Sequence, residues 1–126
     1  MPEKPIKVFL VDDHELMRGL FKGIINLQPD IEVVGEADNG MDAIEKVRRL
    51  NPDVVLMDVS MPMMDGMETT RILKAEWPHI RVIGLTMHDY SYIAPQALNS
   101  GMDTVVDKCA STKELIESIY GNMSAE

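Results

Sequence analysis

Short apolar runs alternate along the chain with longer segments in which apolar residues recur every three or four positions. The runs are rich in β-branched residues, as expected of strands that are covered on both faces of a parallel sheet. Five strands are predicted in this way, at residues 6–11, 31–37, 53–57, 81–85 and 103–106.

The segments between the runs have the spacing of helices with one buried face. The apolar stripes that predict them are Leu16, Leu20, Ile24 and Leu27, then Ala43, Val47 and Leu50, and finally Leu115, Ile119 and Met123. Asp65 and Ser111 each precede a glutamate by three positions, which is the spacing of a capping box at a helix start. Helical segments are followed by Pro29, Pro52 and Pro78, and proline there helps to end a helix.

The segment 89–100 is the weakest predicted helix because Pro95 lies inside it. Proline in a helix interior costs about 3 kcal/mol, since it removes a hydrogen bond and clashes with the preceding turn. We therefore expect this helix to start near Ala94, or to be short and irregular before that residue.

Five strands that alternate with five helices predict an α/β fold, a doubly wound parallel sheet with helices on both faces. Sheets of this kind bind their ligands at the carboxyl ends of the strands, where the strand order reverses. The length of 126 residues fits a single domain over residues 1–126.

Composition narrows the classes of function. With 12 basic and 21 acidic residues the net charge is −9, which argues against binding nucleic acid or an anionic membrane by charge alone. The single cysteine, Cys109, excludes an internal disulfide and a multi-cysteine zinc site. No apolar run approaches the roughly 18 residues of a membrane span, and the amino terminus lacks the apolar core of a secretory signal. We expect a soluble, cytoplasmic protein with no membrane partner.

Polar residues follow four of the predicted strands at their carboxyl ends: Asp12 and Asp13, Asp58, Thr86 and Lys108. Because parallel strands end at one edge of a sheet, three carboxylates, a hydroxyl and an amine should share a pocket there. Clustered carboxylates repel one another, and a proton or a cation must offset that repulsion. Hard oxygen ligands of this kind suit Mg²⁺, which takes one or two protein carboxylates and leaves positions for a phosphate oxygen.

The amine and the hydroxyl of this set could bind the same phosphate group. The Lys108 amine would supply a fixed positive charge and the Thr86 hydroxyl a hydrogen bond. A single aspartate after a strand is usually a turn or cap residue, so the prediction depends on the whole set. The set predicts phosphoryl transfer to a carboxylate, with Asp58 as the nucleophile that becomes an aspartyl phosphate.

These residues carry a resemblance. The chain resembles the receiver domain of two-component response regulators from residue 5 to about residue 122. The sequence around its motifs is similar to that of receivers of the NarL/FixJ type. The motifs are Val-Asp-Asp at 11–13, Leu-Met-Asp-Val-Ser-Met-Pro-Met-Met-Asp-Gly at 56–66, Leu-Thr at 85–86, Ser-Gly-Met-Asp at 100–103, and Lys108. The resemblance implies a flavodoxin-like (βα)₅ fold with strand order 2-1-3-4-5.

The resemblance also implies a metal site and a phosphoacceptor. Asp58 would accept the phosphoryl group and contact Mg²⁺. Asp13 would bind the ion directly and Asp12 through water, and the backbone carbonyl of Ser60 would be a further ligand.

Other positions would handle the phosphoryl group itself. Thr86 would bond it and move on activation, the Met87 amide would add a donor, and Lys108 would pair with its oxygens. Pro62 and Gly66 would shape the loop that follows the phosphoacceptor.

The chain departs from the family pattern at the usual aromatic position three residues before the lysine, which is Val105 here. A valine cannot swing between a buried and an exposed rotamer as a tyrosine does. We expect Thr86 to move without an aromatic partner; Tyr90 or Tyr92 could substitute, although the interpretation as ordinary tyrosines is favoured.

A second departure follows the lysine, where Cys109 replaces the usual proline. A cis bond without proline costs on the order of 3 kcal/mol, so we expect a trans bond with an altered loop or a strained cis bond. A redox role for Cys109 is a weaker interpretation. In the family, the positions of Ser60 and His88 border the phosphoryl group, where His88 would either affect hydrolysis or be a solvated loop residue.

Three other functions compete with this interpretation. A phosphatase of the haloacid-dehalogenase type needs an Asp-x-Asp pattern after its first strand, which is absent. A pseudo-receiver that only binds partners predicts the loss of an acidic or lysine position, and none is lost. A Cu(I) site could use the methionine cluster, but core packing is favoured; its members are Met57, Met61, Met63, Met64 and Met67.

The expected partners are a sensor histidine kinase or a phosphotransfer protein that donates the phosphoryl group. The role is that of a switch rather than an enzyme, with self-catalysed phosphorylation and dephosphorylation only. The fourth helix, fifth strand and fifth helix should form the output face, which could support a homodimer. We expect no nucleic-acid contact by this domain; either it stands alone or, as the subfamily texture favours, it precedes a DNA-binding domain of a transcription regulator.

Overall fold

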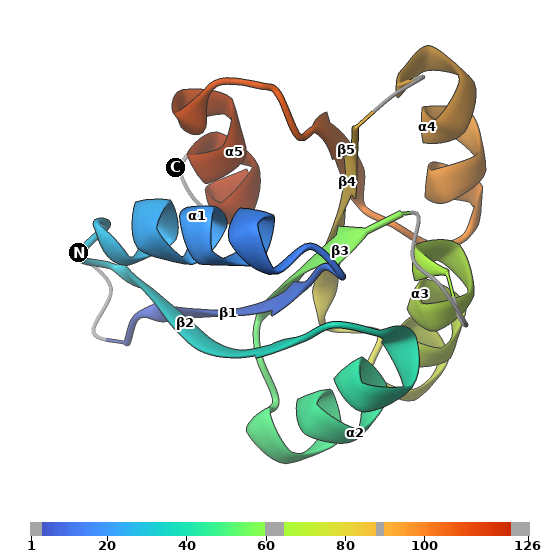
Figure 1. Ribbon diagram of the computed structural model, residues 1–126. Helices are drawn as coiled ribbons and strands as arrows, with labels where there is room; N and C mark the ends of the chain where they lie inside the picture. Colours follow the sequence, from blue (N-terminus) through green and yellow to red (C-terminus); the bar gives the residue numbers. More distant parts are fainter. Residues whose placement is uncertain (1–3, 60–64, 88–89, 122–126) are drawn as a thin grey trace.

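The structure is a computed structural model that describes residues 4–59, 65–87 and 90–121. Its elements alternate along the chain as the sequence predicts, and every strand lies within one residue of its predicted bounds (Figure 1). They are β1 (Ile6–Val11), α1 (Glu15–Asn26), β2 (Ile31–Ala37), α2 (Gly40–Leu50), β3 (Val54–Asp58), α3 (Gly66–Glu76), β4 (Arg81–Thr86), α4 (Tyr90–Asn99), β5 (Thr104–Asp107) and α5 (Thr112–Tyr120).

The five strands form one parallel sheet in the order β2-β1-β3-β4-β5, which confirms the expected flavodoxin-like topology. The chain runs from β1 outward to β2 and then crosses back to place β3 on the other side of β1. The strand order therefore reverses between β1 and β3. Sheets of this kind bind ligands at the carboxyl ends of the strands beside such a reversal.

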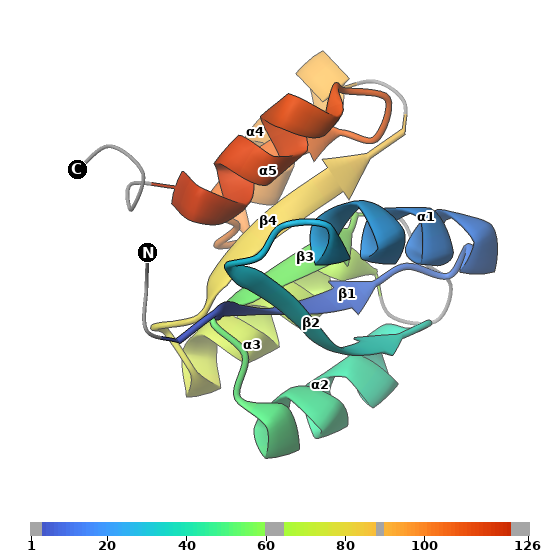
Figure 2. The same ribbon diagram turned by 90° about the vertical axis from the view of Figure 1, so that its left-hand side faces the viewer.

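Helices cover both faces of the sheet and enclose two apolar cores. Successive side chains of a strand point to opposite faces, so Phe9 and Val11 of β1 enter one core while Val8 and Leu10 enter the other. The first core packs against α2, α3 and α4, and the second packs against α1 and α5. Figures 1 and 2 show the two helix layers on either side of the sheet. Burial on both faces accounts for the apolar runs in the sequence.

Both predicted helix caps are present. The Asp65 carboxylate accepts a hydrogen bond from the Glu68 amide at 2.8 Å, and the Ser111 hydroxyl accepts one from the Glu114 amide at 3.1 Å. A third cap was not predicted: the Asn39 side chain accepts from the Asp42 amide at 2.9 Å and starts α2. Such caps satisfy amides that have no partner inside the helix.

Of the predicted apolar stripe of α1, Ile24 packs against the core but Leu16, Leu20 and Leu27 are exposed. Leu16 and Leu20 are 89% and 55% exposed, whereas Phe21 and Ile25 are buried in the core with Met17 beside them. The helix carries apolar residues on more than one face, so both stripes have helical spacing. The spacing predicts the helix but does not determine which stripe packs against the sheet.

The predicted start of the fourth helix is also wrong, because α4 begins at Tyr90 rather than near Ala94 and contains Pro95. Proline lacks only its own amide, so the helix forgoes one backbone hydrogen bond. Ala94 and Ala97 are buried against the sheet, and this packing offsets the loss. Among the residues that the structure describes, no helix is long and apolar enough to cross a lipid bilayer.

Gly66 provides a test of how tightly the end of β3 is packed. A methyl group added there would overlap the backbone carbonyl oxygen of Asp58, whereas one added at Gly19 in α1 would meet nothing within 4 Å. We expect Gly66→Ala to lower the free energy of unfolding by about 1–3 kcal/mol, since backbone must move. Gly19→Ala should raise it by about 0.5–1 kcal/mol through helix propensity. Urea unfolding of the two variants measures both changes; equal effects would contradict the close approach.

Candidate functional site

Carboxylates gather where the strand order reverses. Asp12 directly follows β1 and Asp58 ends β3, and both side chains are buried. Asp13 is more open, with 28% of its side chain exposed. Together with His14 they offer ligand atoms that all lie within 4.8 Å of one another. The predicted meeting of the three aspartates at one edge of the sheet is present, and His14 joins them.

The predicted lysine lies between two of these carboxylates. Lys108 comes from the segment between β5 and α5, and its Nζ atom lies 2.8 Å from Oδ2 of Asp12 and 3.3 Å from Oδ2 of Asp58. Only 2% of the lysine side chain is exposed. The cluster holds three carboxylates and this one amine, so carboxyl groups outnumber the cation and a dication would offset their repulsion.

Burial and pairing act in opposite directions on the pKa values of this pair. Burial would raise the pKa of Asp12, but the bonds from Lys108 and from the His14 amide, with the lysine charge, lower it below its ordinary value. Burial would likewise lower the pKa of Lys108, but its bond to Asp12 and the charges of both aspartates raise it. Both groups are therefore held in their charged forms.

The end of β4 lies beside this pair. Thr86 is buried, its Cα atom is paired with that of Asp107, and its carbonyl oxygen accepts a hydrogen bond from the Lys108 amide at 2.8 Å. Met87 follows and is partly exposed, with its sulfur 3.9 Å from Sγ of Cys109. Thr86 is thus fixed next to the lysine by the backbone of the sheet.

The bond after the lysine is trans, since the described residues contain no cis peptide bond. The Cys109 amide donates to Oδ1 of Asp107 at 2.7 Å, and the Ala110 amide donates to the Asp107 carbonyl at 2.9 Å. Asp107 therefore closes a turn in place of the family's proline, which confirms the trans alternative. Cys109 is exposed at this turn.

The structure describes some of the neighbouring residues for which the sequence predicts a role, and leaves others outside the described part of the chain. Val105 is a core residue, buried opposite Gly84, and Tyr92 is 71% exposed, as an ordinary surface tyrosine would be. The Tyr90 side chain lies outside the described residues, as do Ser60, Pro62 and His88, so the predicted roles at these positions stay predictions.

Of the five methionines that could have formed a Cu(I) site, the structure describes two. Met57 is fully buried in the core and Met67 packs against that core, which favours packing over metal binding for these two. The other three methionines of the cluster belong to residues 60–64, outside the described part of the chain.

A cationic network behind the cluster was missed from the sequence. Arg18 donates to the Asp12 carbonyl oxygen at 2.7 Å and to Glu36 at 2.8 Å, and Lys22 also donates to Glu36 at 2.8 Å. The bonds from Lys22 and then Arg18 lower the pKa of Glu36. This network ties α1 and β2 to the turn that carries the aspartates. The four-residue spacing of Arg18 and Lys22 is its only signal in the sequence.

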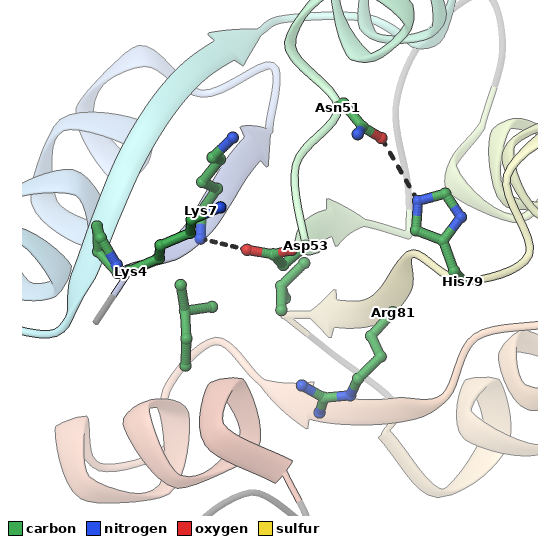
Figure 3. A pocket seen from close by; sticks show the side chains of 9 residues that line it. Lys4, Lys7, Asn51, Asp53, His79 and Arg81 are labelled. Atoms are coloured by element: carbon green, nitrogen blue, oxygen red, sulfur yellow. Dashed lines mark hydrogen bonds between the residues drawn. The ribbon is translucent and has the colours of Figure 1, made fainter. Parts of the chain in front are cut away.

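A cavity of about 430 Å³ lies at the opposite edge, at the amino ends of β1, β3 and β4, and contains no member of the acidic cluster (Figure 3). Two of its charged residues, Asp53 and Arg81, have structural partners. The Lys7 amide donates to Asp53 at 2.9 Å, and Arg81 donates to the carbonyl oxygens of Ile119 and Ser118 at the end of α5, at 2.7 and 2.6 Å. These bonds stabilise the base of the fold, so the acidic edge is the stronger candidate site.

The donor set at the acidic edge fits a hard dication. Three carboxylates supply oxygen ligands; Arg18 and Lys108 both hold Asp12 in place, and Lys108 also contacts Asp58. Mg²⁺ suits oxygen ligands and needs only one or two protein carboxylates.

Comparisons with known proteins agree with this geometry. The family described as "Response regulator receiver domain" matches residues 8–120. The response regulator protein VraR of Staphylococcus saprophyticus is 43% identical over 123 residues, which are 95% of this chain and 59% of VraR. The transcriptional regulatory protein DegU of Brevibacillus brevis is 36% identical over 117 residues, 93% of this chain and 50% of DegU.

Solved structures agree as well. A two-component response regulator of the LuxR family from an Aurantimonas species has a TM-score of 0.90 and 30% identity, covering 98% of this chain and 88% of that chain. The chain therefore matches this structure along nearly its whole length, but it spans only a little over half of VraR.

The buried ion pair predicts a pH-dependent loss of stability in Lys108→Met. At pH 7 we expect the free energy of unfolding to fall by about 3 kcal/mol, as when a buried pair loses one partner. The pKa of Asp12 should rise in the variant, which carboxyl ¹³C NMR measures. Lys113→Met, on the exposed side of α5, is the matched control and should change neither.

The sign of the pH dependence follows from the two shifts. Because the pKa of Asp12 is lowered, its stabilising contribution is present above its ordinary value of 3.8 and is lost as pH falls through the folded-state pKa. Because the pKa of Lys108 is raised, its contribution is present below 10.5 and is lost as pH rises through the folded-state pKa. The difference between parent and variant should shrink at both ends; a constant difference would contradict the pairing.

Proposed function

The chain belongs to the response regulator receiver domain family, and on that basis we propose that it is a phosphoacceptor switch in which Asp58 takes a phosphoryl group from a phosphohistidine. The observation that carries the proposal is the buried amine of Lys108 held between Asp12 and Asp58 at the point where the strand order reverses. The donor would be a sensor histidine kinase or a phosphotransfer protein.

In the proposed reaction, a carboxylate oxygen of Asp58 attacks the phosphorus atom of the phosphohistidine. A P–O bond to Asp58 forms, the P–N bond to the imidazole breaks, and the bonding pair leaves with the imidazole nitrogen. Asp58 would act in this step as a carboxylate, with the amine of Lys108 3.3 Å away. The product is an acyl phosphate, the usual outcome of carboxylate nucleophilic catalysis.

Lys108 and Thr86 would serve the phosphoryl group. Lys108 keeps its charge because its pKa is raised, and it can pair with phosphoryl oxygens once Asp58 is modified. The Thr86 hydroxyl would donate a hydrogen bond to the same oxygens, and the Met87 amide would add a further donor. The backbone bond from Lys108 to Thr86 holds these groups together at one edge.

A magnesium ion, when bound, would neutralise charge on the phosphoryl oxygens during transfer. Asp12, Asp13 and Asp58 would hold it, together with the backbone carbonyl of Ser60, which lies outside the described residues. Asp13, the most open of the three carboxylates, is the one that an incoming ion would meet first.

The output of the switch would differ from that of receivers with an aromatic at the position of Val105. Val105 is packed in the core, and its short side chain cannot swing between buried and exposed positions as an aromatic does, so its rotamer would not report the state of the site. Phosphorylation would instead shift an existing equilibrium of β4 and α4 through Thr86. A surface of α4, β5 and α5 would then contact an effector or a second copy of the chain.

The whole protein is proposed to be a transcription regulator with this receiver at its amino-terminal end. The chain spans 59% of VraR and 50% of DegU, and DegU is named a transcriptional regulatory protein. Contact with DNA would be made by a separate domain, in keeping with the net charge of −9 here. A stand-alone receiver is the alternative. A cytoplasmic location, expected from the sequence, is part of the same proposal.

A second candidate is a pseudo-receiver that binds partners without phosphorylation. The presence of all the acidic residues and of Lys108 at one edge of the sheet favours the phosphorylated switch. The order of residues argues against a haloacid-dehalogenase phosphatase, because the buried carboxylates come from β1 and β3 rather than from one Asp-x-Asp motif.

Phosphorylation by acetyl phosphate tests the proposal. With Mg²⁺ we expect intact-mass spectrometry to show a gain of one phosphoryl group, and Asp58→Asn to abolish it. The matched control is Asp53→Asn, which changes the carboxylate just before the same strand, at its opposite end, and should be phosphorylated like the parent. No mass gain in the parent, or an equal gain in Asp58→Asn, would exclude Asp58 as the phosphoacceptor and favour the pseudo-receiver.

A further inference from the structure

His14 belongs to the acidic cluster, yet the proposed function gives it no task. It stands at the N-cap position of α1, where Ser, Thr, Asp or Asn normally accepts a hydrogen bond from an amide of the first turn. The His14 ring makes no such bond. Its Nδ1 atom lies instead 3.2 Å from Oδ1 of Asp12 and 3.3 Å from Oδ1 of Asp13. The side chain is therefore directed at the carboxylates rather than at the helix.

The backbone holds the ring in this position. The His14 amide donates to Oδ1 of Asp12 at 2.8 Å, while Oδ2 of Asp12 contacts Lys108 at 2.8 Å. The two oxygens of Asp12 thus face different partners, and Oδ1 faces His14. The His14 side chain is 62% exposed, so an ion can reach it from solvent without any change in the core.

The separations fit ligands of a common ion. Two ligands bound at about 2.0–2.2 Å, at angles between a right angle and the tetrahedral angle, lie about 2.8–3.6 Å apart. Both His14 distances fall within this range. A ring-to-carboxylate hydrogen bond has the same length, so an experiment must detect coordination itself.

We propose that His14 is a fourth ligand residue of this site and gives it a preference for transition-metal dications, such as Zn²⁺ and Co²⁺, over Mg²⁺. Imidazole nitrogen favours metals of this kind, whereas carboxylates alone suit Mg²⁺. The inference rests on the proposed function in that both use the same cluster as the metal site. It adds that the site distinguishes between metals through a residue that phosphoryl transfer does not require.

The affinity test uses Cys109→Ser as the parent background, because the exposed thiol would bind Zn²⁺ by itself. Isothermal titration calorimetry measures Kd for Zn²⁺ and Mg²⁺ in this background and in His14→Ala. We expect His14→Ala to raise Kd for Zn²⁺ about tenfold or more and to change Kd for Mg²⁺ by less than about twofold.

Two further variants keep this test interpretable. His14→Asn supplies a good N-cap residue, so it should fold even if His14→Ala weakens α1, and it should show the same loss of Zn²⁺ affinity. His79→Ala is the matched control, because it removes an exposed imidazole at the opposite edge of the sheet and should leave both affinities unchanged.

Coordination is detected by proton NMR of the Co²⁺-loaded protein. An imidazole bound to Co²⁺ gives a strongly shifted ring resonance, which a ring that is merely hydrogen-bonded to the carboxylates does not. We expect such a resonance in the parent background and in His79→Ala, and its loss in His14→Ala and His14→Asn.

The outcomes separate this inference from the proposed function. Unchanged Zn²⁺ affinity in both His14 variants, or no shifted resonance from His14, overturns the inference, while intact Mg²⁺ binding leaves the proposed function standing. Absence of Mg²⁺ and Zn²⁺ binding in the parent, or full binding of both by Asp13→Asn, contradicts the metal site itself and the inference with it.

Discussion

The buried amine of Lys108 between Asp12 and Asp58 is the interaction on which the acidic edge depends. Two buried carboxylates on neighbouring strands repel each other, and without a cation one of them would take up a proton. The positive charge of the amine offsets this repulsion, although the amine is itself buried. The amine reaches this position only if β5 ends beside β4. The parallel pairing of the two strands and the hydrogen bond from the Lys108 amide to the Thr86 carbonyl keep the two ends together.

The topology explains why such a cluster forms here. Asp12 and Asp58 lie at the carboxyl ends of strands that are adjacent in the sheet but separated in the chain by α1, β2 and α2. Because the strand order reverses between β1 and β3, the connections that leave these two strands go in opposite directions. A crevice therefore stays open at their carboxyl ends. Within the described part of the chain the opposite edge has no such cluster, and there Arg81 and Asp53 form bonds that close the base of the fold.

Much of this arrangement could be predicted from the sequence, and the exceptions have physical causes. Strand positions and the meeting of Asp12, Asp58 and Lys108 follow from apolar runs and from parallel topology. The stripe of α1 that packs inward could not be predicted, because Leu16 and Phe21 belong to two stripes of equal spacing and only the sheet selects between them. The start of α4 was misjudged because the cost of Pro95 is local, while the packing that offsets it is tertiary. The role of His14 gave no signal in the sequence and that of Arg18 only its spacing to Lys22, since their partners are set by the shape of one turn and by β2.

The same ion pair connects the chemistry of Asp58 to the rest of the sheet. Lys108 is held on its side-chain end by two carboxylates and on its backbone end by the Thr86 carbonyl. If Asp58 becomes an acyl phosphate, as proposed, the new negative charge lies farther from the strand end than the carboxylate did, and the amine must follow it or lose a partner. Because the Lys108 amide is bonded to Thr86, that adjustment acts directly on the carboxyl end of β4, from which the chain continues to α4. Val105 is buried in the core, so the proposed connection would run through Lys108 and Thr86 rather than through an aromatic rotamer at that position.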